Sequence, residues 1–194
     1  MVLLAEAPAA LRTVLHVGCG AADPGKLPSN FFPAGEWREV RLDIDPAVAP
    51  DIEASITDMA VVDSASVDAV WSAHNLEHLF AHEVPIALAE FRRVLRHGGF
   101  ALVTVPDLQQ VAELVAQDRL AEAAYVSPAG PIAPLDMLYG HGAAIAGGNV
   151  FMAHRTGFTA RTLEAALVAA GFGLVRVVRD RHFALWATAY VTGV

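Results

Sequence analysis

The hydrophobic residues of the chain form short, nearly continuous runs separated by polar turns. Short runs that are apolar throughout are typical of strands buried on both faces of a parallel sheet. We expect strands at 13–17, 37–42, 51–54, 67–71, 100–105, 174–178 and 183–190. The last two strands are joined too tightly for a parallel crossover, so we expect them to form an antiparallel hairpin.

Helical periodicity fills the longer gaps between these runs. Apolar residues recur at helical spacing over 84–95, and Gly98 is expected to end this helix as a left-handed cap. Asp107 is expected to cap a second helix, and Thr159 a third one that Gly171 closes. Helices that alternate with buried strands predict an α/β fold with a mostly parallel sheet.

Composition narrows the class of protein. The 194 residues fit a single domain, 1–194, and a content of 55% hydrophobic against 18% charged residues argues against disorder. No apolar run approaches the roughly 20 residues that span a bilayer. The net charge of −8 argues against a broad nucleic-acid surface. These two observations lead us to expect neither a membrane nor a nucleic-acid partner. The single cysteine fits a reducing compartment, so we expect a cytoplasmic protein.

The first strand leads into a turn with Gly18 and Gly20, whose missing side chains let a ligand approach the main chain closely. Asp43 follows Gly20 by 23 residues, close to the ~20 expected for a carboxylate that grips ribose hydroxyls. The third glycine of the dinucleotide fingerprint is replaced by Asp23, and Pro24 follows it. A cofactor with a ribose but no phosphate therefore fits better than NAD, and S-adenosylmethionine is the leading candidate.

Six short motifs in order carry a family resemblance. They are 16–20 (HVGCG), 42–46 (LDIDP), 66–70 (SVDAV), 74–79 (HNLEHL), 93–99 (RVLRHGG) and 105–107 (VPD). Together they resemble class I S-adenosylmethionine-dependent methyltransferases of the broad type 11 kind, over roughly 11–190. The resemblance implies a Rossmann-like three-layer α/β/α sandwich, mostly parallel, with an antiparallel last strand. In one departure, the proline-rich segment 21–35 replaces the helix that such enzymes usually carry between the first two strands.

The resemblance also implies a cofactor site and a reaction. The methyl group of S-adenosylmethionine would pass to an acceptor, expected to be a small molecule that the sequence does not identify. Ile56 would stack on the adenine and Asp58 would accept from its amine, unless Asp58 only caps a turn. The residues expected to bind the cofactor are Gly18, Cys19, Gly20, Asp43, Ile44, Ile56, Thr57, Asp58, Ala73 and His74.

The segment 125–157 is expected to be an irregular loop on the acceptor side, because long loops in compact domains are usually functional or disordered. Tyr139, His141, Phe151 and His154 would enclose the acceptor; the alternative is a mobile surface excursion. If a proton must leave the acceptor, His74, His141 and His154 are the candidate bases, since histidine titrates near neutrality.

The run 74–78 also matches the H-x-x-E-H motif of inverted zinc proteases. Such a site needs a third protein ligand; Glu83 lies too close in sequence, and no distant glutamate helix stands out. We therefore expect no metal. Two alternatives stay open: a non-catalytic S-adenosylmethionine-binding protein, and a zinc-dependent hydrolase that uses His74, Glu77 and His78.

Overall fold

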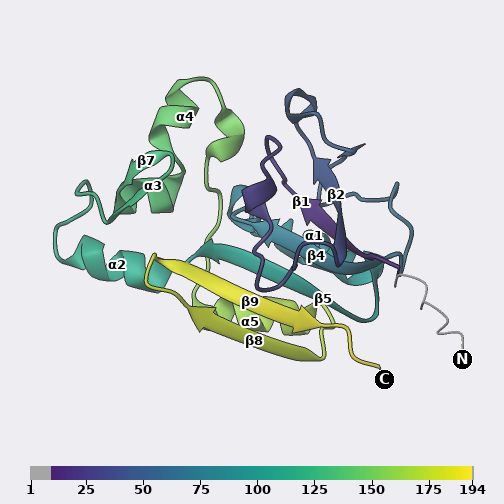
Figure 1. The fold of residues 1–194 in the computed structure, drawn as a ribbon. Coiled ribbons are helices and arrows are strands. Elements are labelled where there is room, and N and C mark those ends of the chain that lie inside the picture. Colours follow the sequence, from purple (N-terminus) through teal and green to yellow (C-terminus); the bar gives the residue numbers. More distant parts are fainter. Residues whose placement is uncertain (1–9, 194) are drawn as a thin grey trace, which may run out of the picture.

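The computed structural model describes residues 10–193, and its main feature is a seven-stranded sheet (Figure 1). The strands stand in the order β3-β2-β1-β4-β5-β9-β8. They are β1 (Arg12–Val17), β2 (Trp37–Asp43), β3 (Ile52–Glu53), β4 (Val67–Ala73), β5 (Leu95–Pro106), β8 (Leu174–Arg179) and β9 (Ala184–Tyr190). The neighbours from β3 to β5 pair in parallel, and β9 is antiparallel to both β5 and β8. The expected mostly parallel sheet with an antiparallel last strand is confirmed.

The three predicted helices are present, and two of them begin at their predicted capping residues. They are α1 (Val84–Val94), α2 (Leu108–Ala116) and α5 (Ala160–Ala169). Asp107 caps α2 by accepting from the Gln109 amide, and Thr159 caps α5 in a capping box with Thr162. Gly171, with φ +90°, follows the end of α5.

The two faces of the sheet are covered by different structures. Helices α1 and α5 pack on one face and bury Phe91 and Leu163 completely. On the other face, the segment 21–36 places Phe31 and Phe32 over the sheet. All three tryptophans of the chain pack in this second cluster, where the Trp71 and Trp186 rings stack at 5.8 Å. Aromatic packing thus covers the sheet where the helix between β1 and β2 is replaced.

Two sequence expectations are wrong. Gly98 does not cap α1, because the chain passes directly from Val94 into β5; its φ of +77° serves a local irregularity of that strand instead. The segment 125–157 is not irregular, since prolines and glycines there delimit short elements. These elements are β6 (Tyr125–Ser127), β7 (Gly130–Ile132), α3 (Pro134–Tyr139), α4 (Gly142–Ala146) and the 3-10 turn η4 (Val150–Met152). In Figure 1 they stand together beyond the ends of the strands.

None of the helices within residues 10–193 has the length and apolar character required to cross a membrane.

Candidate functional site

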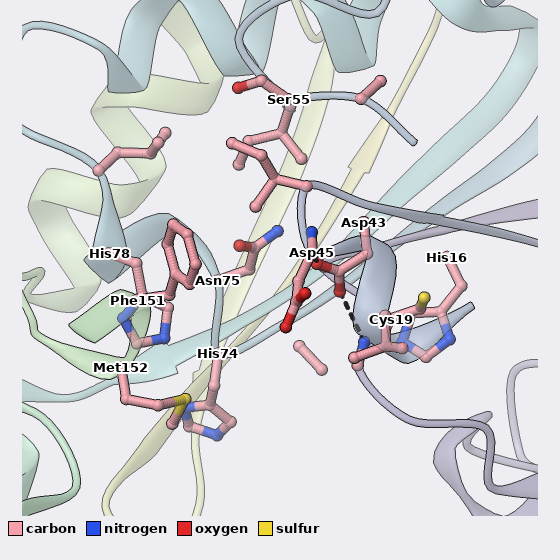
Figure 2. A pocket seen from close by; sticks show the side chains of 18 of the residues that line it. His16, Cys19, Asp43, Asp45, Ser55, His74, Asn75, His78, Phe151 and Met152 are labelled. Carbon is pink, nitrogen blue, oxygen red and sulfur yellow. Dashed lines mark hydrogen bonds between the residues drawn. The ribbon is translucent and has the colours of Figure 1, made fainter. Parts of the chain in front are cut away.

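A cavity of about 530 Å³, which we call the cofactor cavity, lies where β1, β2 and β4 end. The strand order reverses between β1 and β4, and ligands of open α/β sheets bind outside the carboxyl ends of the strands at such a point. Figure 2 shows Cys19 and Asp43 on one side of the cavity and His78 and Phe151 on the other. Of the residues predicted to bind the cofactor, all but Asp58 line it.

Asp43 joins the second strand to the glycine loop. Its Oδ2 accepts from the Gly20 amide at 2.8 Å, shown dashed in Figure 2, and its Oδ1 accepts from the Asp45 amide at 3.0 Å. A carboxylate has about four acceptor positions, so two remain for a ligand. The two sequence signals, the glycine loop and the acid, therefore meet in one wall of the cavity.

Two cations hold the carbonyl groups of the glycine loop. The Lys26 ammonium donates to the carbonyl oxygens of Cys19 and Ala21 at 2.8 and 2.7 Å. Arg41 donates to the Gly20 carbonyl oxygen at 2.5 Å. The carbonyl oxygens of Cys19, Gly20 and Ala21 are thus each paired with a cationic side chain. Lys26 and Arg41 thus stabilise the loop where the usual following helix is replaced.

Gly18 makes room for Asn75 across the cavity floor. Gly18 has φ +58°, and a Cβ atom built there would lie 2.5 Å from the Asn75 Cγ atom. The Asn75 Nδ2 group is buried and has no hydrogen-bond partner among the described residues. Asn75 lines the cavity, and Figure 2 shows its side chain between Phe151 on one side and Asp43 on the other. A buried donor without a partner is costly, so Asn75 is a candidate contact for the cofactor.

At the far end of the cavity, Ile56 and Thr57 line the wall as expected, together with Ser55. The Ser55 and Thr57 hydroxyls share a hydrogen bond of 2.7 Å. Asp58 lies outside this lining, and its exposed carboxylate accepts from the Ala60 amide at 3.3 Å. This is the turn-capping position that the sequence left as the alternative.

A second cavity of about 240 Å³, which we call the acceptor cavity, adjoins the first. His74, His78 and Met152 line both cavities. The acceptor cavity has a mostly apolar wall and several polar groups. The lining includes Glu77, Pro106, Tyr125, Ala129, Ile132, Asp136, Met137, His141, His154, His182 and Phe183. The three predicted candidate bases, His74, His141 and His154, therefore come together here, whereas Tyr139 lies outside both linings and is 65% exposed.

Burial and neighbouring charges shift the histidines in different directions. Burial lowers the pKa of His154, although the charge of Glu77 acts against it. Burial also acts to lower the pKa of His74, but the hydrogen bond and the charge of Glu77 outweigh it, so the pKa of His74 is raised. The His74 Nδ1 and Glu77 Oε1 atoms lie 3.2 Å apart. The site thus holds histidines of different basicity within one cavity system.

Several residues in or beside the cavity lining were not predicted from the sequence; of these, Arg41 contacts the loop without lining the cavity. Lys26 and Arg41 act through the backbone of the loop, which no motif specifies. Lys26 is the only lysine of the chain, and this rarity could have marked it as a candidate site residue. Met152 and Arg155 come from the segment that was expected on the acceptor side, and they also line the cofactor cavity.

Comparisons with known proteins agree with this geometry. Residues 15–103 match the family model described as a methyltransferase domain. A search of curated proteins finds no match. A solved S-adenosylmethionine-dependent methyltransferase from Archaeoglobus fulgidus has a TM-score of 0.60 at 12% identity, covering 92% of this chain and 86% of that one.

Two further structures share the fold. A Burkholderia thailandensis 1,6-didemethyltoxoflavin-N1-methyltransferase, bound to 1,6-didemethyltoxoflavin and S-adenosylhomocysteine, has a TM-score of 0.56 at 16% identity, covering 94% of this chain and 72% of that chain. The CMeT domain of the citrinin polyketide synthase has a TM-score of 0.59 at 13% identity and 94% coverage of this chain. This chain spans 47% of the length of that structure.

A sheet of this order, with a glycine loop and an acid at the reversal point, defines a Rossmann-like protein that binds a nucleoside cofactor. The match of residues 15–103 to a methyltransferase domain supports a class I S-adenosylmethionine-dependent methyltransferase, with S-adenosylmethionine as its cofactor.

Proposed function

We propose that the chain transfers the methyl group of S-adenosylmethionine to a small molecule bound in the acceptor cavity. The observation that carries this proposal is the junction of the two cavities at His74, His78 and Met152. A donor in the first cavity and an acceptor in the second would meet at these side chains. One fold neighbour, the Burkholderia enzyme, is bound to a small molecule together with S-adenosylhomocysteine.

The size and lining of the acceptor cavity support a small acceptor. Its volume of about 240 Å³ lies just below the roughly 300–1,000 Å³ of typical small-molecule sites, so only a small acceptor would fit. Ile132 and Met137 are buried in its wall, and histidines supply polar groups to the lining. Such a lining suits a largely apolar molecule with one polar group, which is the part that would be methylated.

The reaction needs mainly alignment, because the sulfonium already activates the methyl group. An acceptor oxygen or nitrogen attacks the methyl carbon, the carbon–sulfur bond breaks, and S-adenosylhomocysteine leaves. Holding both reactants in this geometry removes most of the entropic barrier. The walls that Phe151 and Met152 add to the cofactor cavity would exclude water from the donor.

Blocking the acceptor cavity from the β6–β7 hairpin tests the proposal. Ala129 is exposed and lines the acceptor cavity, so Ala129→Trp should fill that cavity without disturbing the buried core. We expect unchanged S-adenosylmethionine affinity by calorimetry and loss of methyl transfer in a mass-spectrometric screen of small molecules. Val126→Trp is the matched control, because Val126 lies on the same hairpin and is 77% exposed.

Equal turnover by the Ala129→Trp and Val126→Trp variants would place the acceptor elsewhere. The two open alternatives give other results. A non-catalytic binding protein would bind S-adenosylmethionine and methylate nothing in the screen. A zinc-dependent hydrolase would turn over ester or amide substrates without the cofactor.

A further inference from the structure

Three side chains that could ligate a metal ion converge in the acceptor cavity. One ligand atom from each of Glu77, His78 and His154 lies within 4.8 Å of those of the other two. Glu77 and His78 follow β4, whereas His154 comes from the segment after η4. The sequence offered no third ligand for the H-x-x-E-H motif, and the fold supplies one from 76 residues further along the chain than His78.

The hydrogen bonds of the two imidazoles leave one nitrogen of each free for this cluster. The Nδ1 atom of His78 lies 3.2 Å from the Ala153 carbonyl oxygen, and Nδ1 of His154 lies 2.9 Å from the Met137 carbonyl oxygen. A carbonyl only accepts, so each Nδ1 carries the proton and each Nε2 keeps its lone pair. A protein carbonyl on the second nitrogen is the usual outer partner of a metal-ligating histidine.

Glu77 contributes a carboxylate oxygen with no other use. Its side chain is 1% exposed, and Oε2 is buried without a hydrogen-bond partner among the described residues. Its Oε1 atom is held by His74, 3.2 Å away. A buried carboxylate oxygen without a partner is costly, and a cation between Glu77, His78 and His154 would remove that cost. His74 would then act as a positioning residue and not as a ligand.

The backbone holds the two halves of the cluster together. The Arg155 and Thr156 amides donate to the Glu77 carbonyl oxygen at 2.8 and 3.2 Å, and the His154 amide donates to the Tyr139 carbonyl oxygen at 3.1 Å. These backbone hydrogen bonds hold the segment that carries His154 beside Glu77. Zinc bonds of about 2.0–2.2 Å place tetrahedral ligand atoms about 3.4 Å apart, so small side-chain rotations suffice to close the site.

We infer that Glu77, His78 and His154 bind one divalent transition-metal ion, of the zinc or cobalt kind, in the wall of the acceptor cavity. Two imidazoles and a carboxylate favour such ions over magnesium or calcium. Three protein ligands leave a coordination position for water or substrate, as in catalytic zinc sites. Asp136, the other acid of this wall, is engaged by the amides of Ala133 and Gly142 and is not a fourth ligand.

The role of the ion rests on the proposed function. All three ligands line the acceptor cavity, so the open position faces it. An acceptor hydroxyl bound to the ion would release its proton to water more readily. Its oxygen would then attack the methyl carbon as the carbon–sulfur bond breaks. The acceptor class that this chemistry selects is a largely apolar small molecule with a hydroxyl group.

Metal titration tests the site without any acceptor. Protein without a polyhistidine tag, stripped with a chelator, is titrated with Co²⁺, followed by visible absorption, and with Zn²⁺, followed by calorimetry. We expect one equivalent of each ion in the wild type, and at least about tenfold weaker binding in His154→Ala and Glu77→Gln. His182→Ala is the matched control, because His182 lines the same cavity outside the cluster.

The outcomes separate the inference from the proposed function. Absent binding by the wild type, or equal affinity in His154→Ala and His182→Ala, overturns the metal site. If His154→Ala fails to fold by circular dichroism, His78→Gln replaces it with the same expectation. His74→Ala should weaken binding about tenfold while one equivalent still binds, which supports its positioning role. Metal binding without methylation of any hydroxylated small molecule leaves the site intact and contradicts the proposed function.

Discussion

The Gly20 amide donates to the Asp43 carboxylate across 2.8 Å, which joins two sequence signals that lie 23 residues apart. Strand β1 pairs in parallel with β2, from Arg12 beside Trp37 to Val17 beside Leu42. The two strands therefore end together, and the residue after each end faces the same cavity. The loop and the acid are thus a single structural unit, and we expect substitutions in either to weaken cofactor binding.

Replacement of the acid tests this unit directly. Asp43→Ala should weaken S-adenosylmethionine binding by about 1.5–3 kcal/mol, the range for a hydrogen bond to a charged group. Asp43→Asn should lose less, because its amide oxygen still accepts from Gly20. Isothermal calorimetry measures both. Asp58→Ala is the control and should bind normally, since Asp58 lies outside the cavity lining; weaker binding by that variant would restore Asp58 to the site.

Substitution of Lys26 tests the glycine loop without altering Asp43. Lys26→Met keeps the aliphatic stem but loses both donations to loop carbonyls, so we expect about tenfold weaker S-adenosylmethionine binding. Arg38→Met is the control, because the side chain of Arg38 donates a long 3.4 Å bond to Thr13, away from the loop. Amine-reactive labelling adds a second readout, since Lys26 is the only lysine. If Lys26 is labelled at the same rate with and without S-adenosylmethionine, the placement of Lys26 in the cofactor site is contradicted.

Gly140 should be required for the structure that carries His154. It has φ +97°, and a Cβ atom there would overlap the Met152 carbonyl oxygen. Gly140→Ala should therefore cost more than the about 1–3 kcal/mol of backbone strain alone. Gly148→Ala is the matched control, because Gly148 has φ +98° and no atom of residues 10–193 lies within 4 Å of the new methyl group. Urea denaturation should show the larger loss for Gly140→Ala, and equal losses would remove the steric argument.

Asp68 should make stability depend on pH in acid solution. Burial acts to raise the pKa of Asp68, but hydrogen bonds from the Thr13 amide and Arg96 outweigh it, so the pKa lies below its ordinary value of 3.8. A carboxylate with a depressed folded pKa adds stability above its unfolded pKa and loses it as pH falls through the folded pKa. Asp68→Asn should thus cost about 1–2 kcal/mol at neutral pH and less below about pH 4.

Denaturation at both pH values measures this difference. Asp63→Asn, at an exposed acid on the loop before β4, is the control and should change stability little at either pH. An undiminished cost of Asp68→Asn at pH 3 would show that charge is not the cause.

The sequence alone determined the sheet, the cofactor and many of the residues that line the cofactor cavity. Buried apolar runs specify strands because apolar residues on both strand faces must be covered on both sides. The caps Asp107 and Thr159 mark helix starts because their side chains satisfy local amides. The glycine loop and Asp43 could be paired in advance because parallel strands end at one edge of the sheet. These features depend on local chemistry and a fixed periodicity.

Only the tertiary structure decided how distant segments meet. Lys26 and Arg41 hold carbonyls of a loop, and Phe31 and Phe32 replace a helix over the sheet; no spacing rule specifies such contacts. The 125–157 segment looked irregular because its elements are too short to show a period. His154 reaches Glu77 and His78 through backbone pairing between segments far apart in sequence. Such contacts join residues that are far apart in the sequence. Each contact depends on how all the intervening elements pack, which no local pattern in the sequence specifies.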